Sequence, residues 1–414
     1  MRILNVVTQY WPYMGGAPNY IKEMSERFVK DGNEVTVYTT NAWDLEYLFF
    51  SDRARTNLST EVINGVKVRR YPVRHPSRHG LTRQVLGRVP LKTCRLLFRF
   101  PSAILPELWR DLLIEGRRYD LIHATPSPFY SLIYPAYIAA RFWRKPFAVT
   151  PFVHTGTPRG DSQIAMHTQP DQVSVLKASD LVIVQSAVER KALIEKGISE
   201  CKINILGMGV NPDDVSGGNP EHFRSKYKIA EKEKIIAYVG ALIHDKGAFH
   251  LLDAFVKLKK QLGHVRLVMA GHASVEFQNY FSEKPKEIKK SCILMGNVGG
   301  EDKASLFQAC DVLALPSRAD SYGIVILEAW LAGKPVIGAY AGGIPEVISD
   351  GEDGFLVPFG DVHMLSEYLS NFMKNPELCT RMGQRGREKV ITSCTWDQRY
   401  QKMLRWLEDL TGRR

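Results

Sequence analysis

Short apolar runs alternate with helical apolar faces along the whole chain. The runs predict strands at residues 3–7, 34–39, 66–70, 120–124, 147–152, 180–184, 203–206, 235–239, 265–270, 293–295, 312–315, 335–338 and 355–357. Between them, apolar residues recur at helical spacing and predict helices such as 248–260, with Leu251, Leu252, Phe255 and Leu258 on one face. This alternation predicts an α/β fold whose parallel sheets carry helices on both faces.

A stretch dense in Gly, Pro, Asn and Asp separates the two halves of the chain. It reads LGMGVNPDDVSGGNP over 206–220. Each half has about the length of one Rossmann-like domain, so we predict domains at 1–208 and 219–395. A last helix within 396–414 is expected to pack back on the first domain. Ligands of open α/β sheets bind beyond the carboxyl ends of the strands, so two such sheets facing each other predict a central cleft.

One acid lies inside the most apolar of the predicted helices. Glu328 is surrounded in the sequence by Ile, Val, Leu, Ala and Trp. A helix that is apolar on all sides is a buried helix, and a carboxylate there is costly unless it is hydrogen-bonded or paired. Glu328 therefore predicts a polar partner, and a ligand hydroxyl is one candidate.

Three junctions between a strand and a helix are suited to binding phosphate. Gly15 and Gly16 follow the first strand, Lys246 ends the segment GALIHDK, and the amides of 321–325 open the helix that holds Glu328. Taken singly, a glycine pair after a strand is usually a turn, and a lysine at a helix start is usually a surface residue. The sequence has neither GxGxxG after the first strand nor GxxxxGK[ST], which disfavours a nicotinamide dinucleotide site and a P-loop.

Composition narrows the class of protein. The chain has 414 residues, 44% of them hydrophobic, and no stretch near the ~18 continuous apolar residues of a membrane span. The start, MRILNVVTQYW, lacks the pattern of a secretory signal. Six cysteines are scattered without metal-type spacing, and no His/Asp cluster suggests a metal site. We therefore expect a cytoplasmic protein with no metal.

The net charge of +11 is concentrated in one segment. Residues 62–106 contain ten basic residues and no acid, which leaves 45 basic against 44 acidic residues elsewhere. The segment also carries large apolar residues, so it fits a peripheral element on anionic membrane. It fits equally a solvated basic helix packed on its own domain. Nucleic acid is disfavoured because no recognised nucleic-acid module surrounds it.

Several motifs in order along the chain resemble the family 4 retaining glycosyltransferases of GT-B fold. The family motif PSxxExFGxxxxEA is matched by PSRADSYGIVILEA at 316–329. Also present are GG after the first strand and, in order, ASDLVIVQS at 178–186, VGALIHDKG at 239–247, GGIPE at 342–346 and DGEDGFLVP at 350–358. The resemblance implies two Rossmann-like domains facing a central cleft. It also implies a hexosyltransferase (EC 2.4) that moves a sugar from a nucleotide-diphospho-sugar to a glycan or lipid-linked acceptor, without metal or cofactor.

The resemblance also implies roles for single residues. Glu328 would bind the ribose hydroxyls, and Lys246 with the amides of 323–325 would hold the diphosphate. His154, at the end of a predicted strand, would lie near the transferred sugar, although a histidine capped by its neighbours is the alternative. The predicted site comprises His154, Lys246, Asp320 and Glu328 at the chemistry and Gly15, Gly16, Gly240, Gly323, Ile324 and Val325 around the substrate.

The chain departs from the family pattern at two positions. The family usually has Glu where this chain has Asp320, and Arg where it has Ala241. The missing Arg removes a positive charge beside the leaving diphosphate, which Arg318 is hypothesised to replace. Both departures would suit a non-catalytic subunit that binds a partner glycosyltransferase. A nucleotide-sugar epimerase and a phosphorylase on the same scaffold are further alternatives.

Overall fold

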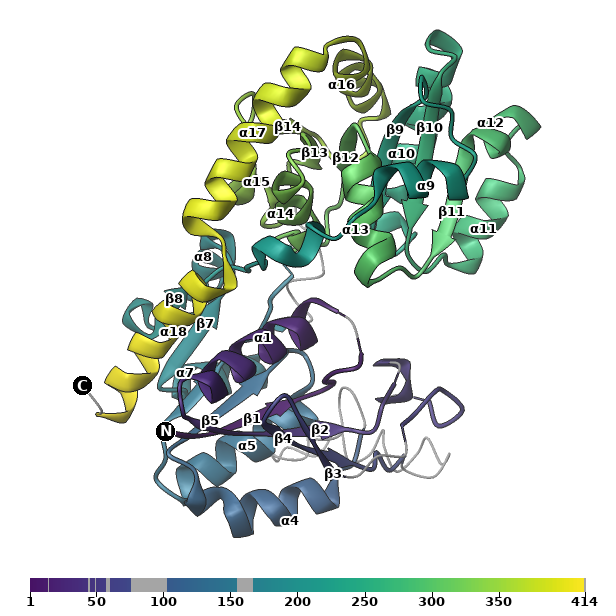
Figure 1. The fold of residues 1–414 in the computed structure, drawn as a ribbon. Helices are drawn as coiled ribbons and strands as arrows, with labels where there is room; N and C mark the ends of the chain where they lie inside the picture. The colour runs from purple at the N-terminus through teal and green to yellow at the C-terminus, as the bar shows by residue number, and fades with distance from the viewer. Residues whose placement is uncertain are drawn as a thin grey trace. The chain divides into compact units, whose positions relative to one another are not determined.

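The chain forms two β-sheets flanked by helices, each with its own hydrophobic core. The computed structural model describes residues 1–13, 15–43, 45–48, 50–56, 60–75, 103–154 and 167–412. Contacts divide these residues into two compact units at Gly207 and Met208 (Figure 1). The first unit also takes the chain from Arg399 onwards, and the second takes His154.

Within the described residues, the sheet of the first unit has the strand order β3-β4-β2-β1-β5-β6-β7-β8. Its strands are β1 (Arg2–Val7), β2 (Glu34–Thr40), β3 (Thr60–Ile63), β4 (Val66–Tyr71), β5 (Leu121–Thr125), β6 (Phe147–Val149), β7 (Leu181–Val184) and β8 (Ile203–Ile205). Its helices are α1 (Gly16–Lys30), α4 (Pro106–Glu115), α5 (Tyr130–Phe142), α7 (Pro170–Ala178) and α8 (Ala187–Glu195), with short 3-10 turns η1 (Leu45–Leu48), η2 (Gly116–Arg118) and η3 (Glu200–Lys202). The strand order reverses at β1, so right-handed crossovers place α1 and α5 on opposite faces, as Figure 1 shows.

The first sheet differs from the predicted pattern at two places. The sheet is not wholly parallel, because β3 pairs antiparallel with β4 through a tight turn at Asn64 and Gly65, both with positive φ. Asn-Gly is the preferred loop of such a hairpin, and β3 was not predicted. The strand predicted at 147–152 ends at Val149, since Pro151 cannot donate a backbone hydrogen bond. His154 therefore lies on the loop beyond β6 rather than at a strand end.

The sheet of the second unit is parallel throughout, with the order β11-β10-β9-β12-β13-β14 in the described residues. Its strands are β9 (Lys234–Val239), β10 (Val265–Ala270), β11 (Cys292–Gly296), β12 (Val312–Leu315), β13 (Val336–Ala339) and β14 (Gly354–Val357). Its helical elements are η4 (Pro212–Val215), α9 (Pro220–Lys226), η5 (His244–Lys246), α10 (Ala248–Gln261), α11 (Val275–Ser282), α12 (Lys286–Ser291), α13 (Gly300–Ala309), α14 (Ile324–Leu331), α15 (Ile344–Val347), α16 (Val362–Lys374) and α17 (Pro376–Ser393). The order reverses between β9 and β12, and open α/β sheets bind ligands at such a switch point.

The last helix, α18 (Trp396–Thr411), packs on α1 of the first unit from Arg399 onwards. The Tyr400 hydroxyl donates to an Asp31 carboxylate oxygen at 2.6 Å, and the Tyr400 ring meets Phe28 edge to face at 4.9 Å. Among the described helices, none is both long and apolar enough to cross a membrane.

Candidate functional site

The loops that follow β9 and β12 meet at the switch point of the second sheet. Lys246, the last residue of η5, donates from Nζ to Asp320 Oδ1 at 2.8 Å and to the Ala319 carbonyl at 3.0 Å. The Tyr238 hydroxyl donates to the Ala241 carbonyl at 2.8 Å and so fixes the loop that carries Lys246. The structure therefore brings together two predicted site residues that lie far apart in the sequence.

A second ion pair ties the same two loops. Arg318 donates from Nη2 to Asp245 Oδ1 at 2.8 Å, and its guanidinium lies 5.0 Å from the centre of the Phe359 ring. Asp245 thus already pairs with Arg318, the residue hypothesised to supply positive charge beside the diphosphate. Arg318 serves first to hold the η5 loop against the loop after β12.

Helix α14 begins where the loop after β12 ends. Its N-cap is Gly323, with φ of 77°, a conformation that favours glycine, and no side chain caps the helix. The N-caps of α1 and α10, Gly15 and Gly247, also offer no side-chain acceptor. By contrast, Ser or Asn side chains cap α8, α9 and α11. The first amides of α14, including those of Ile324 and Val325, are therefore suited to an anion.

The loop at Gly342 packs against the backbone of Asp320. Gly342 has φ of 58°, and a Cβ atom there would lie 2.3 Å from the Asp320 carbonyl oxygen. The neighbouring Gly343 amide donates to that same carbonyl at 2.9 Å. The GGIPE motif thus fixes the backbone of Asp320 by close approach.

Opposing effects set the charge states around Asp320. Burial disfavours its ionised form, but the Lys246 ammonium outweighs burial and holds the pKa of Asp320 below its ordinary value. Burial, together with the nearby Lys246, lowers the pKa of His154 to about 4. Its Nδ1 lies 3.4 Å from the Ser321 hydroxyl. At neutral pH the site therefore combines an anionic Asp320 with a neutral His154.

Glu328 is buried on α14, as the sequence predicted, and it has a protein partner. Lys303 of α13 donates from Nζ to Glu328 Oε1 at 2.6 Å. Burial raises the pKa of Glu328, and Lys303 opposes that rise. Lys303 was not predicted from the sequence, because its pairing with Glu328 depends on how α13 and α14 pack and leaves no local motif.

Each of the two site acids keeps one oxygen for another partner. Asp320 Oδ2 and Glu328 Oε2 are buried without a hydrogen-bond partner among the described residues. Leaving such an oxygen unsatisfied costs ~1–3 kcal/mol, and more when it is charged. Two unsatisfied carboxylate oxygens, one just before α14 and one within it, together with the uncapped N-terminus of this helix, fit a site that binds a polar, anionic ligand.

The predicted glycines differ in what they do. The Gly240 amide donates to the Ala270 carbonyl at 2.9 Å, so the sheet already uses it. Gly15 and Gly16 belong to the first unit and open α1. A Cβ atom at Gly16 would meet nothing within 4 Å, so packing within the chain does not require glycine there.

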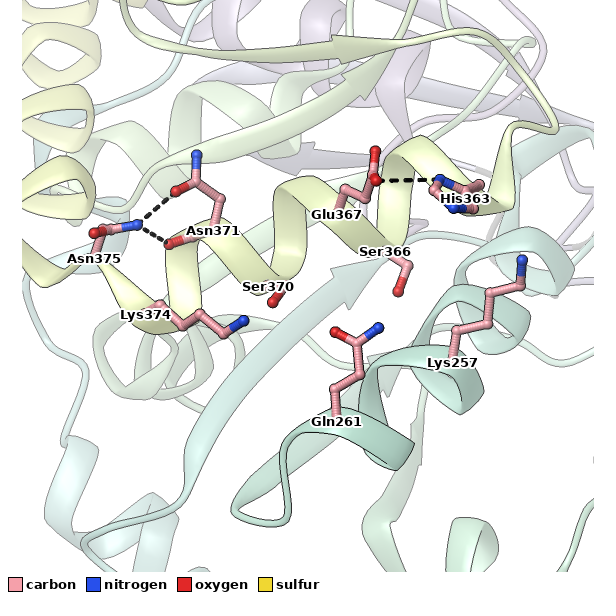
Figure 2. Close-up of a pocket in the computed structure, with 9 residues that line it drawn as sticks. All are labelled: Lys257, Gln261, His363, Ser366, Glu367, Ser370, Asn371, Lys374 and Asn375. Carbon is pink, nitrogen blue, oxygen red and sulfur yellow. Dashed lines mark hydrogen bonds and ion pairs between the residues drawn. The ribbon is translucent and has the colours of Figure 1, made fainter.

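A surface pocket of about 460 Å³ lies elsewhere in the second unit, between α10 and α16. Figure 2 shows polar side chains around it, among them Lys257, Gln261 and His363, whose Nδ1 lies 3.4 Å from Glu367 Oε1. It contains none of the predicted site residues. Nor do the described residues contain a cluster of three or more His, Cys, Asp or Glu side chains arranged to hold a metal ion.

Comparisons with known proteins identify the family of the chain. Residues 15–209 match the glycosyl transferase 4-like domain, and residues 219–389 match the glycosyl transferases group 1. An uncharacterised glycosyltransferase of Methanocaldococcus jannaschii is 26% identical over 371 residues, which cover 86% of this chain and 85% of that protein. The D-inositol 3-phosphate glycosyltransferase of Streptomyces scabiei is 26% identical over 393 residues, covering 89% and 81%.

Solved structures agree on the fold. The Anabaena protein HepE in complex with UDP has a TM-score of 0.73 at 19% identity, covering 99% of this chain and 100% of that one. Its complex with UDP-glucose has a TM-score of 0.71. The GT-B fold of two α/β domains, predicted from the sequence, is thereby confirmed, and its sheets are predominantly parallel. The chain belongs to the group 1 glycosyltransferases and is a transferase of class EC 2.4.

Proposed function

We propose that the protein transfers a sugar from a nucleotide-diphospho-sugar to an acceptor hydroxyl, with retention at the anomeric carbon. One observation carries the proposal: Asp320, just before α14, and Glu328, within it, each have an unpartnered, buried oxygen, and no side chain caps the N-terminus of that helix. A nucleotide-sugar offers hydroxyls on its ribose and its sugar, with a diphosphate between them. It matches two acids separated by an anion site.

Different residues of the site bind different parts of the donor. The amides of Gly323, Ile324 and Val325 and the Lys246 ammonium bind the diphosphate. Glu328 accepts hydrogen bonds from the ribose, and Asp320 accepts one from the transferred sugar. The neutral His154 lies near the same sugar and does not add positive charge there. Gly16 belongs to the first unit, and its role towards the phosphates stays an expectation from the family resemblance.

The chemistry follows from this distribution of charge. The bond from the anomeric carbon to the diphosphate oxygen breaks while a bond to the acceptor oxygen forms on the same face. The acceptor proton passes to an oxygen of the leaving diphosphate. Negative charge grows on the diphosphate, where Lys246 and the helix amides are fixed to stabilise it. The transfer then requires neither a carboxylate base nor a metal ion.

Slow hydrolysis of UDP-glucose without acceptor tests the mechanism. We expect ¹H NMR to show α-glucose first, before mutarotation, at a rate that EDTA leaves unchanged. Initial β-glucose, or strict dependence on added Mg²⁺ or Mn²⁺, would contradict retention or metal independence. Conversion of the donor to UDP-galactose would instead indicate an epimerase, and a requirement for inorganic phosphate would indicate a phosphorylase.

For the acceptor, we propose a glycan or lipid-linked hydroxyl at the cytoplasmic face of an anionic membrane. Four of the ten basic residues of 62–106 are paired with acids of the first unit: Lys67 with Glu34, Arg69 with Asp111, Arg70 with Glu61 and Arg74 with Glu107. The other six lie outside the described residues, so the membrane proposal rests on the sequence of 76–102.

Changing Arg83, Arg88 and Arg95 together to Glu should release the protein from anionic liposomes at low salt. Absence of binding by the unchanged protein would refute it.

A further inference from the structure

The ion pair between Lys303 and Glu328 crosses from α13 to α14 inside the second unit. The Nζ to Oε1 distance is 2.6 Å, and only 7% of the Glu328 side chain is exposed. The other oxygen, Oε2, is buried without a partner in the described part of the chain. Lys303 thus occupies one side of the carboxylate and leaves the other available.

The protonation state of Glu328 decides what the available oxygen can do. A carboxylate accepts hydrogen bonds at both oxygens, whereas the neutral acid turns one of them into a donor. Ribose hydroxyls that donate to Glu328 need the carboxylate. Burial favours the neutral acid, so a cation beside it is needed to keep the acceptor.

Two charged groups, on different elements, act on the carboxyl group of Glu328. Lys303 of α13 favours the carboxylate, and Asp214 of η4 opposes it. On α17, which also packs against α14, Lys389 is paired with Asp353 at 2.7 Å. The neighbouring strands β12 and β13 consist of apolar residues. Lys303 is therefore the cation in contact with Glu328.

We propose that Lys303 is a positioning residue for the donor nucleotide. It holds Glu328 as a carboxylate and fixes Oε1, so that Oε2 accepts a ribose hydroxyl. The inference rests on the proposed function, because it requires a nucleotide at Glu328. It assigns Lys303 a role in donor binding that acts through Glu328 and not through contact with the sugar.

The test measures donor affinity by calorimetry from pH 6 to pH 9, with UDP-glucose, GDP-mannose and ADP-glucose as probes. The diphosphate of such a donor does not titrate in this range, but a uracil or guanine ring begins to ionise at its alkaline end, so each variant is compared with the unchanged protein at the same pH. For Lys303→Met, we expect binding about tenfold weaker than the unchanged protein at pH 6 and within about threefold at pH 9, as Glu328 ionises. Lys303→Arg should restore affinity at pH 6.

The matched control is Lys226→Met. Lys226 pairs with Asp302, the residue before Lys303, at 2.7 Å on the exposed side of α13. This variant should bind the donor as the unchanged protein does at every pH. Lys303→Gln replaces Lys303→Met in the series if the latter does not fold.

The outcomes separate the two claims. If the unchanged protein binds none of the three donors, the proposed function fails. If it binds one, and the Lys303 variants bind equally well or are weakened by the same factor at every pH, Lys303 only joins two helices and the inference is overturned.

Discussion

Asp320 and Glu328 are acids of one motif whose surroundings shift their pKa values in opposite directions. Burial disfavours the charge of both. At Asp320 the Lys246 ammonium outweighs burial, and the pKa falls. At Glu328 burial outweighs Lys303, and the pKa rises. The acid assigned to the transferred sugar is therefore firmly anionic, whereas the acid assigned to the ribose depends on its partner.

Asp320→Asn separates sugar transfer from diphosphate binding. We expect kcat to fall about 100-fold, because the variant loses a fixed charge at the transferred sugar. UDP itself should bind equally well or better, because Lys246 no longer pairs with a competing carboxylate. Steady-state kinetics and calorimetry with UDP measure the two effects.

The control for this variant is Asp253→Asn, since Asp253 pairs with Lys284 at 2.8 Å on α10, away from the site. It should leave kcat unchanged. An Asp320→Asn protein with unchanged kcat would show that Asp320 takes no part in transfer.

At the scale of elements, the site is built by loops that hold one another at the switch point of the second sheet. The η5 loop is tied to the loop after β12 by Asp245–Arg318 and Lys246–Asp320. The loop after β13 closes on the same segment through Gly342. Because the loops share these contacts, a change in one should displace the others.

Gly342→Ala tests that coupling. The substitution places a side chain at positive φ and a Cβ atom against the Asp320 carbonyl. We expect it to lower the free energy of unfolding by about 1–3 kcal/mol and to reduce kcat beyond what the lost stability explains. Urea unfolding and steady-state kinetics measure the two effects.

Gly351→Ala is its matched control, because Gly351 has φ of 77° and no atom within 4 Å of an added Cβ. Gly351→Ala adds only the strain of a side chain at positive φ, without a steric contact, so kcat of this variant should not change. Equal kcat for the two variants would contradict a positioning role for Gly342.

The core of the first unit holds a neutral histidine across β1 and β5. His123 Nδ1 lies 3.0 Å from Asn5 Oδ1, and its Nε2 lies 2.8 Å from the Thr150 hydroxyl. Burial lowers the pKa of His123 to about 3. Its unfolded pKa is about 6.5, so below that pH the unfolded chain binds a proton that the folded chain does not. This contribution to stability is present above pH 6.5 and is lost as the pH falls towards 3.

The pH dependence can be isolated with His123→Gln. Between pH 6 and pH 4, the difference in free energy of unfolding between the unchanged protein and the variant should shrink by about 1.4 kcal/mol per pH unit. Urea unfolding at each pH gives that difference. A constant difference would show that His123 is protonated in the folded state.

For the whole molecule, the sequence was sufficient to predict most of the strands. Buried strands such as β9 and β12 are continuous apolar runs, so the hydrophobic pattern alone predicts them. The edge strand β3 is only partly buried, so its apolar pattern is weak, although its Asn-Gly turn was visible. Edge strands are decided by pairing more than by burial.

The contacts between site residues were beyond the sequence. Lys246 and Asp320 meet because β9 and β12 are neighbours, and Lys303 meets Glu328 because α13 lies beside α14. Neither pairing has a local signal. The motif predicts which residues form the site, and the packing determines which protein partner each one has and hence its charge state.

The central claim is that Glu328, the first amides of α14 and Lys246 bind a nucleotide-diphospho-sugar. A thermal-shift screen against UDP-, GDP- and ADP-sugars tests it most directly, because a ligand that binds the folded state raises Tm. We predict that donors of one nucleotide raise Tm and that Glu328→Gln abolishes the rise. No shift with any of the three, or an equal shift in Glu328→Gln, would contradict the account.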